Sequence, residues 1–254
     1  MIELTDYPKL HCPFVRKTYE VNRDDWRKYG RELQLRKPEV YLVTPEINPG
    51  YEWVFDDPDT IAVEKLDGTN VKLLTKNGRL ISLYNRKNPI DPLNLFISKG
   101  RTAIIEGVFR AVAKGYVEKD GEQCGEVIGP HINQNIYKLD HCIWYPFEKA
   151  VKHLSYRSFH EHERSFETWS SWFKEYLISR FAAKMGNSIM AEGLVFYNLK
   201  RKEQNKIYRA KLRRDMYDWF YSDRIEINET EGHESLDKLR TLRPSKGKRK
   251  GQPH

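Results

Sequence analysis

A lysine and an aspartate stand two residues apart at the end of an apolar segment, in the stretch VEKLDGTNVKL. A lysine amine that is partly removed from water, with other cations nearby, has a lowered pKa and can attack carbonyl or phosphoryl centres. Lys65 and Asp67 could face one cavity, and Gly68 permits a tight turn close to a ligand. Taken alone, the stretch is better explained by a surface lysine and aspartate before a glycine turn.

Further chemistry-bearing residues follow in four downstream segments. These are Glu126 in QCGEVIGP, Phe147 in WYPFEKA, Glu192 in MAEGLVFYN, and Arg209 with Lys211 in IYRAKLRR. Arg209 and Lys211 are two apart on an expected strand, so both project to one face and could bind phosphates. Asp67 and Glu192 offer oxygen ligands suited to Mg²⁺. One nucleophilic lysine, several carboxylates and two cations predict a site for phosphoryl transfer.

The order of these segments resembles a known superfamily. EKLDGTN, GEVIGP, WYPFEK, AEGLVF and YRAKLRR, between residues 59 and 214, look like motifs I, III, IIIa, IV and V of the covalent nucleotidyltransferases. That superfamily contains the ATP-dependent polynucleotide ligases and the mRNA capping enzymes. Each motif is weak alone, whereas five in the right order are specific. The resemblance implies an α+β fold, an ATP-grasp-like domain of two antiparallel sheets flanked by helices, with the nucleotide between the sheets.

Within the superfamily, three features resemble the ATP-dependent RNA ligases that seal nicks in duplex RNA. Asn70 in KLDGTN stands where DNA ligases and capping enzymes usually carry arginine, and Arg86 in YNRKNPI matches the motif Ia arginine. The stretch GEVIGPHINQNIYKL is similar to the segment that follows motif III. Arg209 departs from the pattern because motif V commonly begins with lysine, which binds phosphate with different geometry. A DNA ligase, a capping guanylyltransferase and a catalytically silent RNA-binding module are the alternatives.

The resemblance also implies a role for each residue in joining an RNA 3′-OH to a 5′-phosphate. Lys65 would carry AMP, and Lys211 and Arg209 would neutralise phosphate charge. Arg86 would bind ATP and also clamp the RNA 5′-phosphate. Asp67 and Glu192 would hold Mg²⁺ or Mn²⁺. The other ATP-binding residues implied are Glu64 at the purine edge, Asn70, Glu126 at the ribose hydroxyls, and Phe147 stacked on adenine.

Apolar periodicity predicts the elements that must position these residues. Strands are expected at 60–65, 71–75 and 80–84, with Asn77 and Gly78 as a type I′ hairpin turn. Others are expected at 123–128, 142–147, 193–197 and 207–212, the last two joined by a polar loop at 198–205. Amphipathic helices are expected at 101–117 and 166–181. The aromatic residues of the second helix are better explained as core than as a base-stacking platform.

Composition supports a folded protein with a basic end. The chain has 254 residues and 39% hydrophobic content, enough for a full core. We expect an adenylyltransferase domain at 1–221 and a short, polar, basic and partly disordered extension at 222–254. Five of the eight net positive charges fall within 241–254, a segment without acids. Two explanations stay open for that tail: a solvated end, or a salt-sensitive phosphate contact.

The remaining features concern location and partners. No apolar run approaches the roughly 20 residues of a membrane span, and MIELTDYPKL lacks signal-peptide features, so we expect a cytoplasmic protein. The three cysteines lack metal-type spacing and are expected to be reduced thiols. Only 43 residues follow Lys211, too few for the five strands of an OB domain. RNA is the expected partner, together with a protein that would replace the missing C-terminal domain.

Overall fold

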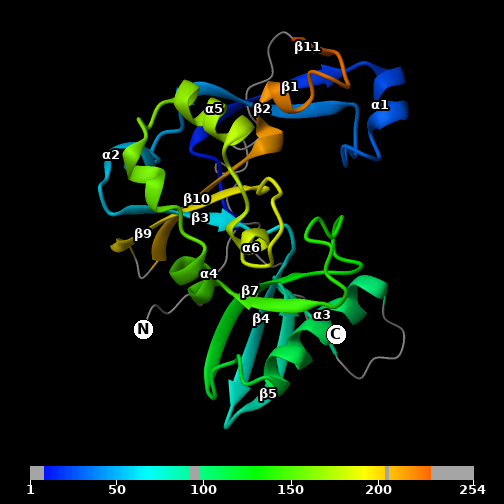
Figure 1. Ribbon diagram of the computed structural model, residues 1–254, viewed down its shortest axis with the longest axis vertical. Helices are drawn as coiled ribbons and strands as arrows, with labels where there is room; N and C mark the ends of the chain where they lie inside the picture. The colour runs from blue at the N-terminus through cyan, green and yellow to red at the C-terminus, as the bar shows by residue number, and fades with distance from the viewer. Residues whose placement is uncertain (1–8, 92–97, 204–205, 230–254) are drawn as a thin grey trace, which may run out of the picture. The chain divides into compact units, whose positions relative to one another are not determined.

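The computed structural model describes residues 9–91, 98–203 and 206–229. The chain divides into two compact units (Figure 1). The first contains residues 9–13 and 47–215 of the described chain, and the second contains residues 14–46 and 216–229. The boundary expected at residue 221 therefore falls inside the second unit.

A three-stranded antiparallel sheet forms one half of the first unit. It has the order β10–β9–β3, with β3 at Thr60–Lys65, β9 at Gly193–Glu203 and β10 at Lys206–Arg213. β9 runs well into the predicted loop at 198–205, because its antiparallel register with β10 extends to Glu203 opposite Lys206. One face of the sheet is apolar: Phe196 is buried and stacks on the Trp169 ring at 5.2 Å between centroids. The prediction that such aromatics form core is confirmed for Trp169.

A five-stranded antiparallel sheet forms the other half. Its order is β6 (Asn88–Pro89), β5 (Arg79–Asn85), β4 (Thr69–Lys76), β7 (Gly121–Ile128) and β8 (Ile143–Pro146). Helix α3 (Lys99–Ala113) begins at the cap Ser98 and lies against this sheet (Figure 1). Asn77 and Gly78 have φ angles of 51° and 73°, as the predicted type I′ turn between β4 and β5 requires. The buried residues between helix and sheet include Val71, Leu73, Val108, Val127 and Trp144.

Short helices connect the strands of this unit. They are α2 (Trp53–Asp56), α4 (Phe147–His153), α5 (Phe166–Glu175) and α6 (Arg180–Ala183), with 3-10 turns at Arg157–Glu161 and Arg214–Met216. The single helix predicted at 166–181 is wrong, because the chain leaves helical geometry after Glu175. Ile178 forms a β-bridge with Met190, and the Ser179 hydroxyl then accepts the backbone N–H of Ala182 as the cap of α6.

The second unit contains a small sheet that periodicity did not predict. Its order is β11–β1–β2, with β1 at Phe14–Val21, β2 at Glu39–Ile47 and β11 at Ile227–Glu229. Helix α1 (Arg23–Tyr29) follows β1, and a 3-10 turn at Asp218–Phe220 precedes β11. The core consists of Val21, Val40, Leu42, Tyr221 and Ile225. Residues 227–229, which we expected to belong to a terminal extension, pair with β1.

Both units are mixtures of helices and antiparallel strands, so the predicted α+β class with antiparallel sheets is confirmed. Among the described residues, no helix is long and apolar enough to cross a membrane. The basic tail at 241–254 lies outside the described residues.

Candidate active site

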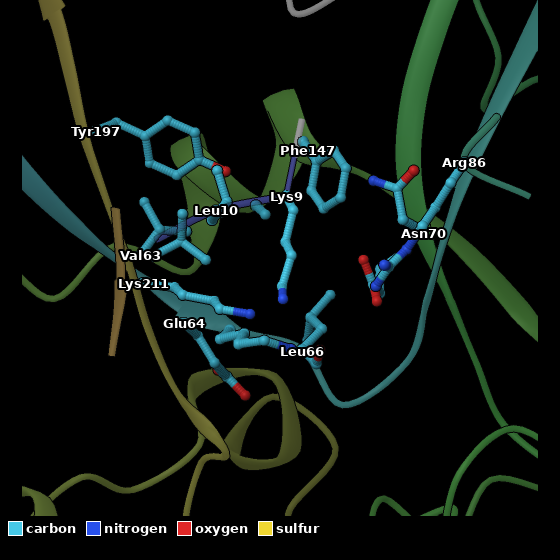
Figure 2. Close-up of a pocket in the computed structure, with 14 residues that line it drawn as sticks. Lys9, Leu10, Val63, Glu64, Leu66, Asn70, Arg86, Phe147, Tyr197 and Lys211 are labelled. Atoms are coloured by element: carbon cyan, nitrogen blue, oxygen red, sulfur yellow. Dashed lines mark hydrogen bonds between the residues drawn. The ribbon is translucent and has the colours of Figure 1, made fainter. Parts of the chain in front are cut away.

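A pocket in the first unit brings together seven residues that the sequence predicts for the site. Its walls include Glu64, Lys65, Asn70, Arg86, Glu126, Phe147 and Lys211. Lys9, Leu10, Val63, Leu66, Ala150, Val195 and Tyr197 complete the lining. Figure 2 shows the Lys9 and Lys211 amines extending into the pocket from different sides, with Asn70 and Arg86 on the opposite wall. The pocket therefore joins residues that are as much as 200 positions apart in the chain.

The register of the three-stranded sheet explains why its cations meet. Gly193 of β9 lies between Lys65 of β3 and Arg213 of β10, and Val195 lies between Val63 and Lys211. Alternate residues of a strand share one face, so both rows belong to the pocket side. A Cβ atom on Gly193 would come within 2.2 Å of the Leu212 carbonyl oxygen, so no side chain can stand between the two cations of its row.

Glu192, immediately before β9, is the partner of the predicted nucleophile. Its Oε2 atom lies 2.7 Å from Lys65 Nζ, and both side chains are about four-fifths buried, with 21% and 20% exposed. Burial lowers the pKa of Lys65, but Glu192 and then Glu126 raise it, and the net direction is upward. The sequence led us to expect a lowered pKa. In this structure Lys65 is instead an ammonium ion held by a carboxylate.

The pKa of Lys211 is shifted in the opposite direction to that of Lys65. Burial, followed by the charges of Arg213 and Lys65, lowers the pKa of Lys211 to about 8. Its backbone N–H donates to the His11 carbonyl at 2.9 Å, which attaches the N-terminal segment carrying Lys9 to β10. The depressed pKa that we predicted for the nucleophile therefore occurs at the second lysine of the site.

Arginines flank Lys211 on the same face of β10. Arg209 is two residues before it, opposite Tyr197, and lies outside the pocket lining. Arg213 is two residues after it, with Nε 3.0 Å from Asp215 Oδ1 and one guanidinium nitrogen 3.8 Å from Glu192 Oε1. We did not predict Arg213 as a site residue, although strand alternation from Lys211 would have identified it.

The opposite wall comes from the five-stranded sheet and is less charged. Asn70 of β4 pairs with Glu126 of β7, and the backbone N–H of Arg86 donates to the Asn70 carbonyl at 3.2 Å. Burial and the nearby Glu192 raise the pKa of Glu126 to about 8, although Lys65 and Arg86 act in the opposite direction. At neutral pH Glu126 is therefore a carboxylic acid, which can donate a hydrogen bond as well as accept one.

Phe147 supplies an aromatic ring at the top of the pocket (Figure 2). The strand predicted through this residue ends at Pro146, and Phe147 begins α4. Leu10, Val63 and Tyr197 lie at the other apolar part of the lining. Leu10 and Tyr197 were absent from our predictions. Tyr197 lies two residues beyond Val195 on one strand face, whereas no local pattern relates Leu10 to the motifs.

Glu64 precedes the predicted nucleophile Lys65 but turns its carboxylate away from the labelled lysine amines (Figure 2). The carboxylate is buried and accepts the Ser179 hydroxyl at 2.6 Å and the Phe181 backbone N–H at 2.8 Å. Burial raises the pKa of Glu64, although these hydrogen bonds oppose the shift. The carboxylate is therefore engaged with the start of α6, and the predicted contact with a purine edge would require these bonds to break.

Asp67 lies in the three-residue turn between β3 and β4, outside the pocket lining. Its Oδ1 atom accepts the side-chain amide of Asn133 at 2.7 Å, and its backbone N–H donates to the Tyr137 hydroxyl at 3.2 Å. Gly68 next to it has no space for a side chain, since a Cβ atom would meet the Val127 carbonyl oxygen at 2.4 Å. The turn is therefore packed tightly against β7.

The carboxylates that the sequence predicts for a magnesium ion are those of Asp67 and Glu192. No group of three or more metal-type side chains occurs among the residues that the structure describes. Burial and the charge of Glu192 raise the pKa of Asp67, which indicates that the two carboxylates lie close enough to repel each other. A divalent cation would relieve this repulsion, and Mg²⁺ commonly uses one or two carboxylates together with water and substrate phosphates.

Comparisons with known proteins give a distant structural likeness. No family model matches the chain, and no curated protein matches it. Structures of an RNA ligase from Naegleria gruberi align with TM-scores of 0.38 for a mutant without ligand and 0.39 for a mutant with ATP and Mn. The identities are 16% and 12%, and the alignments cover 65% and 87% of this chain and 51% and 63% of the ligase chains. This chain thus spans about half of the first ligase's length, and scores this low carry no functional argument.

Proposed function

We propose that this protein is an ATP-dependent RNA ligase that joins 3′-OH and 5′-phosphate ends through a lysyl-AMP intermediate. The observation that carries the proposal is the Lys65–Glu192 ion pair, which lies beside Lys211 in a pocket that also contains Phe147. A buried lysine with a carboxylate partner and a second cation is the arrangement that nucleophilic attack on a phosphate requires.

In the first step, the Lys65 amine attacks the α-phosphorus of ATP. One ammonium proton passes to Glu192, whose Oε2 atom is 2.7 Å away, and the neutral amine then forms a bond from nitrogen to phosphorus while a second proton leaves with the pyrophosphate. The bond from the α-phosphorus to pyrophosphate breaks, so lysyl-AMP and pyrophosphate are the products. Lys211 neutralises the charge that develops on the α-phosphate.

Residues of both walls hold the nucleotide during this step. Phe147 stacks on the base, and Glu126 contacts the ribose hydroxyls as a neutral acid. Asp67 and Glu192 are the residues that would hold Mg²⁺ or Mn²⁺, which supplies charge neutralisation of the phosphates when bound. Arg209 stays a secondary phosphate ligand in this proposal because it lies outside the pocket lining.

Two further transfers complete the reaction. An oxygen of the RNA 5′-phosphate attacks the lysyl-AMP phosphorus, which breaks the bond to Lys65 and forms an adenylylated RNA end. The RNA 3′-OH then attacks that end, forms the phosphodiester and releases AMP. Arg86 clamps the RNA 5′-phosphate through its guanidinium group. Asn70 lies next to Arg86 and contributes the preference for RNA.

The first step is tested by incubating the protein with α-labelled ATP and Mg²⁺, denaturing it, and measuring label on the chain. We expect label on the wild type and none on Lys65→Ala. Lys72→Ala is the matched control, because Lys72 also forms a strand ion pair, 3.0 Å from Glu122, but lies outside the pocket lining. Unlabelled wild-type protein, or labelled Lys65→Ala protein, would contradict the mechanism.

Substrate choice is tested separately. Labelling by GTP in preference to ATP would indicate a capping guanylyltransferase. Nicked duplexes with either RNA or DNA on the 3′-OH strand distinguish an RNA ligase from a DNA ligase, and we expect sealing only with RNA. Salt-sensitive RNA binding without any lysyl-AMP would indicate a silent RNA-binding module.

A further inference from the structure

The loop from β7 to β8 contacts the Asp67 turn through Asn133 and Tyr137 and has hydrogen bonds of its own. Asn135 closes it by donating its side-chain amide to the Leu139 carbonyl at 2.9 Å and accepting the Leu139 N–H at 3.1 Å. Three side chains of this loop are buried: Ile132, Tyr137 and Leu139. Its residues with left-handed backbone geometry are His131, Asn133, Asn135 and Lys138, with φ between 45° and 63°. Such a concentration of unusual backbone geometry is characteristic of functional loops.

Asn133 is the residue of this loop that reaches the turn with its side-chain amide. Its Nδ2 atom donates to Asp67 Oδ1 at 2.7 Å and to the Gly68 carbonyl at 3.0 Å. One NH₂ group thus fixes both a carboxylate and the backbone of the next residue. Asn133 is exposed, so these bonds contribute little to the hydrophobic core, and their main effect is on the orientation of Asp67.

We propose that Asn133 is a positioning residue that holds the Asp67 carboxylate in the orientation in which it would bind the divalent cation of the ATP complex. This inference rests on the proposed function and extends it to a residue outside the pocket lining. Groups that hydrogen-bond to metal-binding carboxylates set their orientation, and their loss commonly weakens metal binding by about 10- to 100-fold.

The identity of the residue suits this role. The φ of 45° favours asparagine, aspartate or glycine, but only asparagine of these three offers two N–H donors for two acceptors. Asn133→Asp keeps the size and the backbone preference while it turns the donor into an acceptor facing two oxygens. Asn133→Gly removes the side chain without backbone strain. Both variants therefore test the contact rather than the loop geometry.

The experiment measures the Mg²⁺ concentration that gives half-maximal lysyl-AMP formation. We expect Asn133→Gly to raise it about tenfold, because the Asp67 carboxylate loses its hydrogen bond. Asn133→Asp should raise it less, because the added carboxylate also attracts the cation. Asn135→Gly is the matched control, since it has the same backbone preference and loses two hydrogen bonds of the same loop. It should lower the melting temperature and leave the Mg²⁺ requirement within about twofold of wild type.

A binding measurement keeps the inference independent of catalysis. In the Lys65→Ala background, calorimetry should show that Mg²⁺ tightens ATP binding, and that adding Asn133→Gly removes most of this gain. An unchanged Mg²⁺ requirement in Asn133→Gly, or an equal shift in Asn135→Gly, would overturn the positioning role. Mg²⁺-dependent ATP binding without any lysyl-AMP in the wild type would overturn the ligase mechanism alone. Absence of ATP binding would overturn both.

Discussion

The two sheets of the first unit line one pocket and differ in the charge of the side chains that they contribute to it. The three-stranded sheet carries Lys65 and Arg213 in the row of Gly193, and Lys211 in the row of Val195. Glu192, the residue before β9, is the counterion of Lys65. The wall of the five-stranded sheet presents the neutral Asn70 and Glu126, whose pKa is raised to about 8, together with the cation Arg86. Under the proposed function, Lys65 and Lys211 would meet the reacting phosphate of ATP, Asn70 and Glu126 would meet the nucleoside, and Arg86 would meet the RNA 5′-phosphate. Variants of the first sheet should lower the rate, whereas those of the second should lower affinity.

The largest effect is expected from Glu192→Gln, which removes the proton acceptor of Lys65. General-base catalysis typically contributes about 10²- to 10⁴-fold, so lysyl-AMP formation should fall by that order in single-turnover labelling. Because Glu192 raises the pKa of Lys65, the rise of rate with pH should also move to lower pH in the variant. A slower reaction with an unchanged pH profile would contradict this assignment.

Lys211→Ala should have the second largest effect. The rate of lysyl-AMP formation should fall by about 10²- to 10³-fold in the same assay, as for removal of one charge-stabilising group. ATP affinity should change much less, since the interaction develops in the transition state. Lys211→Arg restores charge with different geometry and should recover part of the rate. If Lys211→Ala lowered only the ATP affinity, the two sheets would no longer differ in their effects on rate and on affinity.

Phe147→Ala tests the nucleoside side of the pocket. Stacking on an aromatic ring is worth about 1–3 kcal/mol per base, so the ATP concentration for half-maximal labelling should rise about 5- to 150-fold. The maximal rate at saturating ATP should stay close to that of wild type. Phe147→Trp should keep the affinity. An equal loss of maximal rate would show that Phe147 also orders the reacting groups.

Glu126→Gln should have the smallest effect, because the amide imitates the neutral acid. Labelling below pH 7 should stay within about threefold of wild type. The folded state binds the Glu126 proton more tightly than the unfolded state, so the protonated carboxyl group stabilises the folded state at low pH. This stabilisation is lost as pH rises from the ordinary carboxyl range toward about 8. The melting temperature of wild type should therefore fall more than that of Glu126→Gln between pH 5 and pH 8.

Local patterns predicted most of the first unit and none of the second. β3 has the bounds that periodicity indicated, and the turn at Asn77–Gly78 is where its residue types require it. The sheet of the second unit depends on pairing Val21 with Ile227, about 200 residues away, and such a contact leaves no local signal. The helix at 166–181 was overextended for a related reason, since its end is set by the bridge between Ile178 and Met190.

The site shows the same limit. The order of motifs was enough to predict seven pocket residues, because each motif belongs to a strand or turn with a defined face. It could not give the charge state of Lys65, which depends on a 2.7 Å contact with Glu192, 127 residues later. It also missed Asn133, whose effect comes from where its loop folds back onto Asp67.

The packing of Gly68 has a consequence for motion within the site. Only Leu66, Asp67 and Gly68 separate the strand that carries the nucleophile from the strand that carries Asn70. A Cβ atom at Gly68 would lie 2.4 Å from the Val127 carbonyl oxygen, so the main chain there is packed closely against β7. An AMP group carried by Lys65 would have to reach its successive acceptors by rotation of the lysine's four methylene groups, with the main chain held still. The reach of that side chain then sets how far apart the partners of the successive transfers can lie.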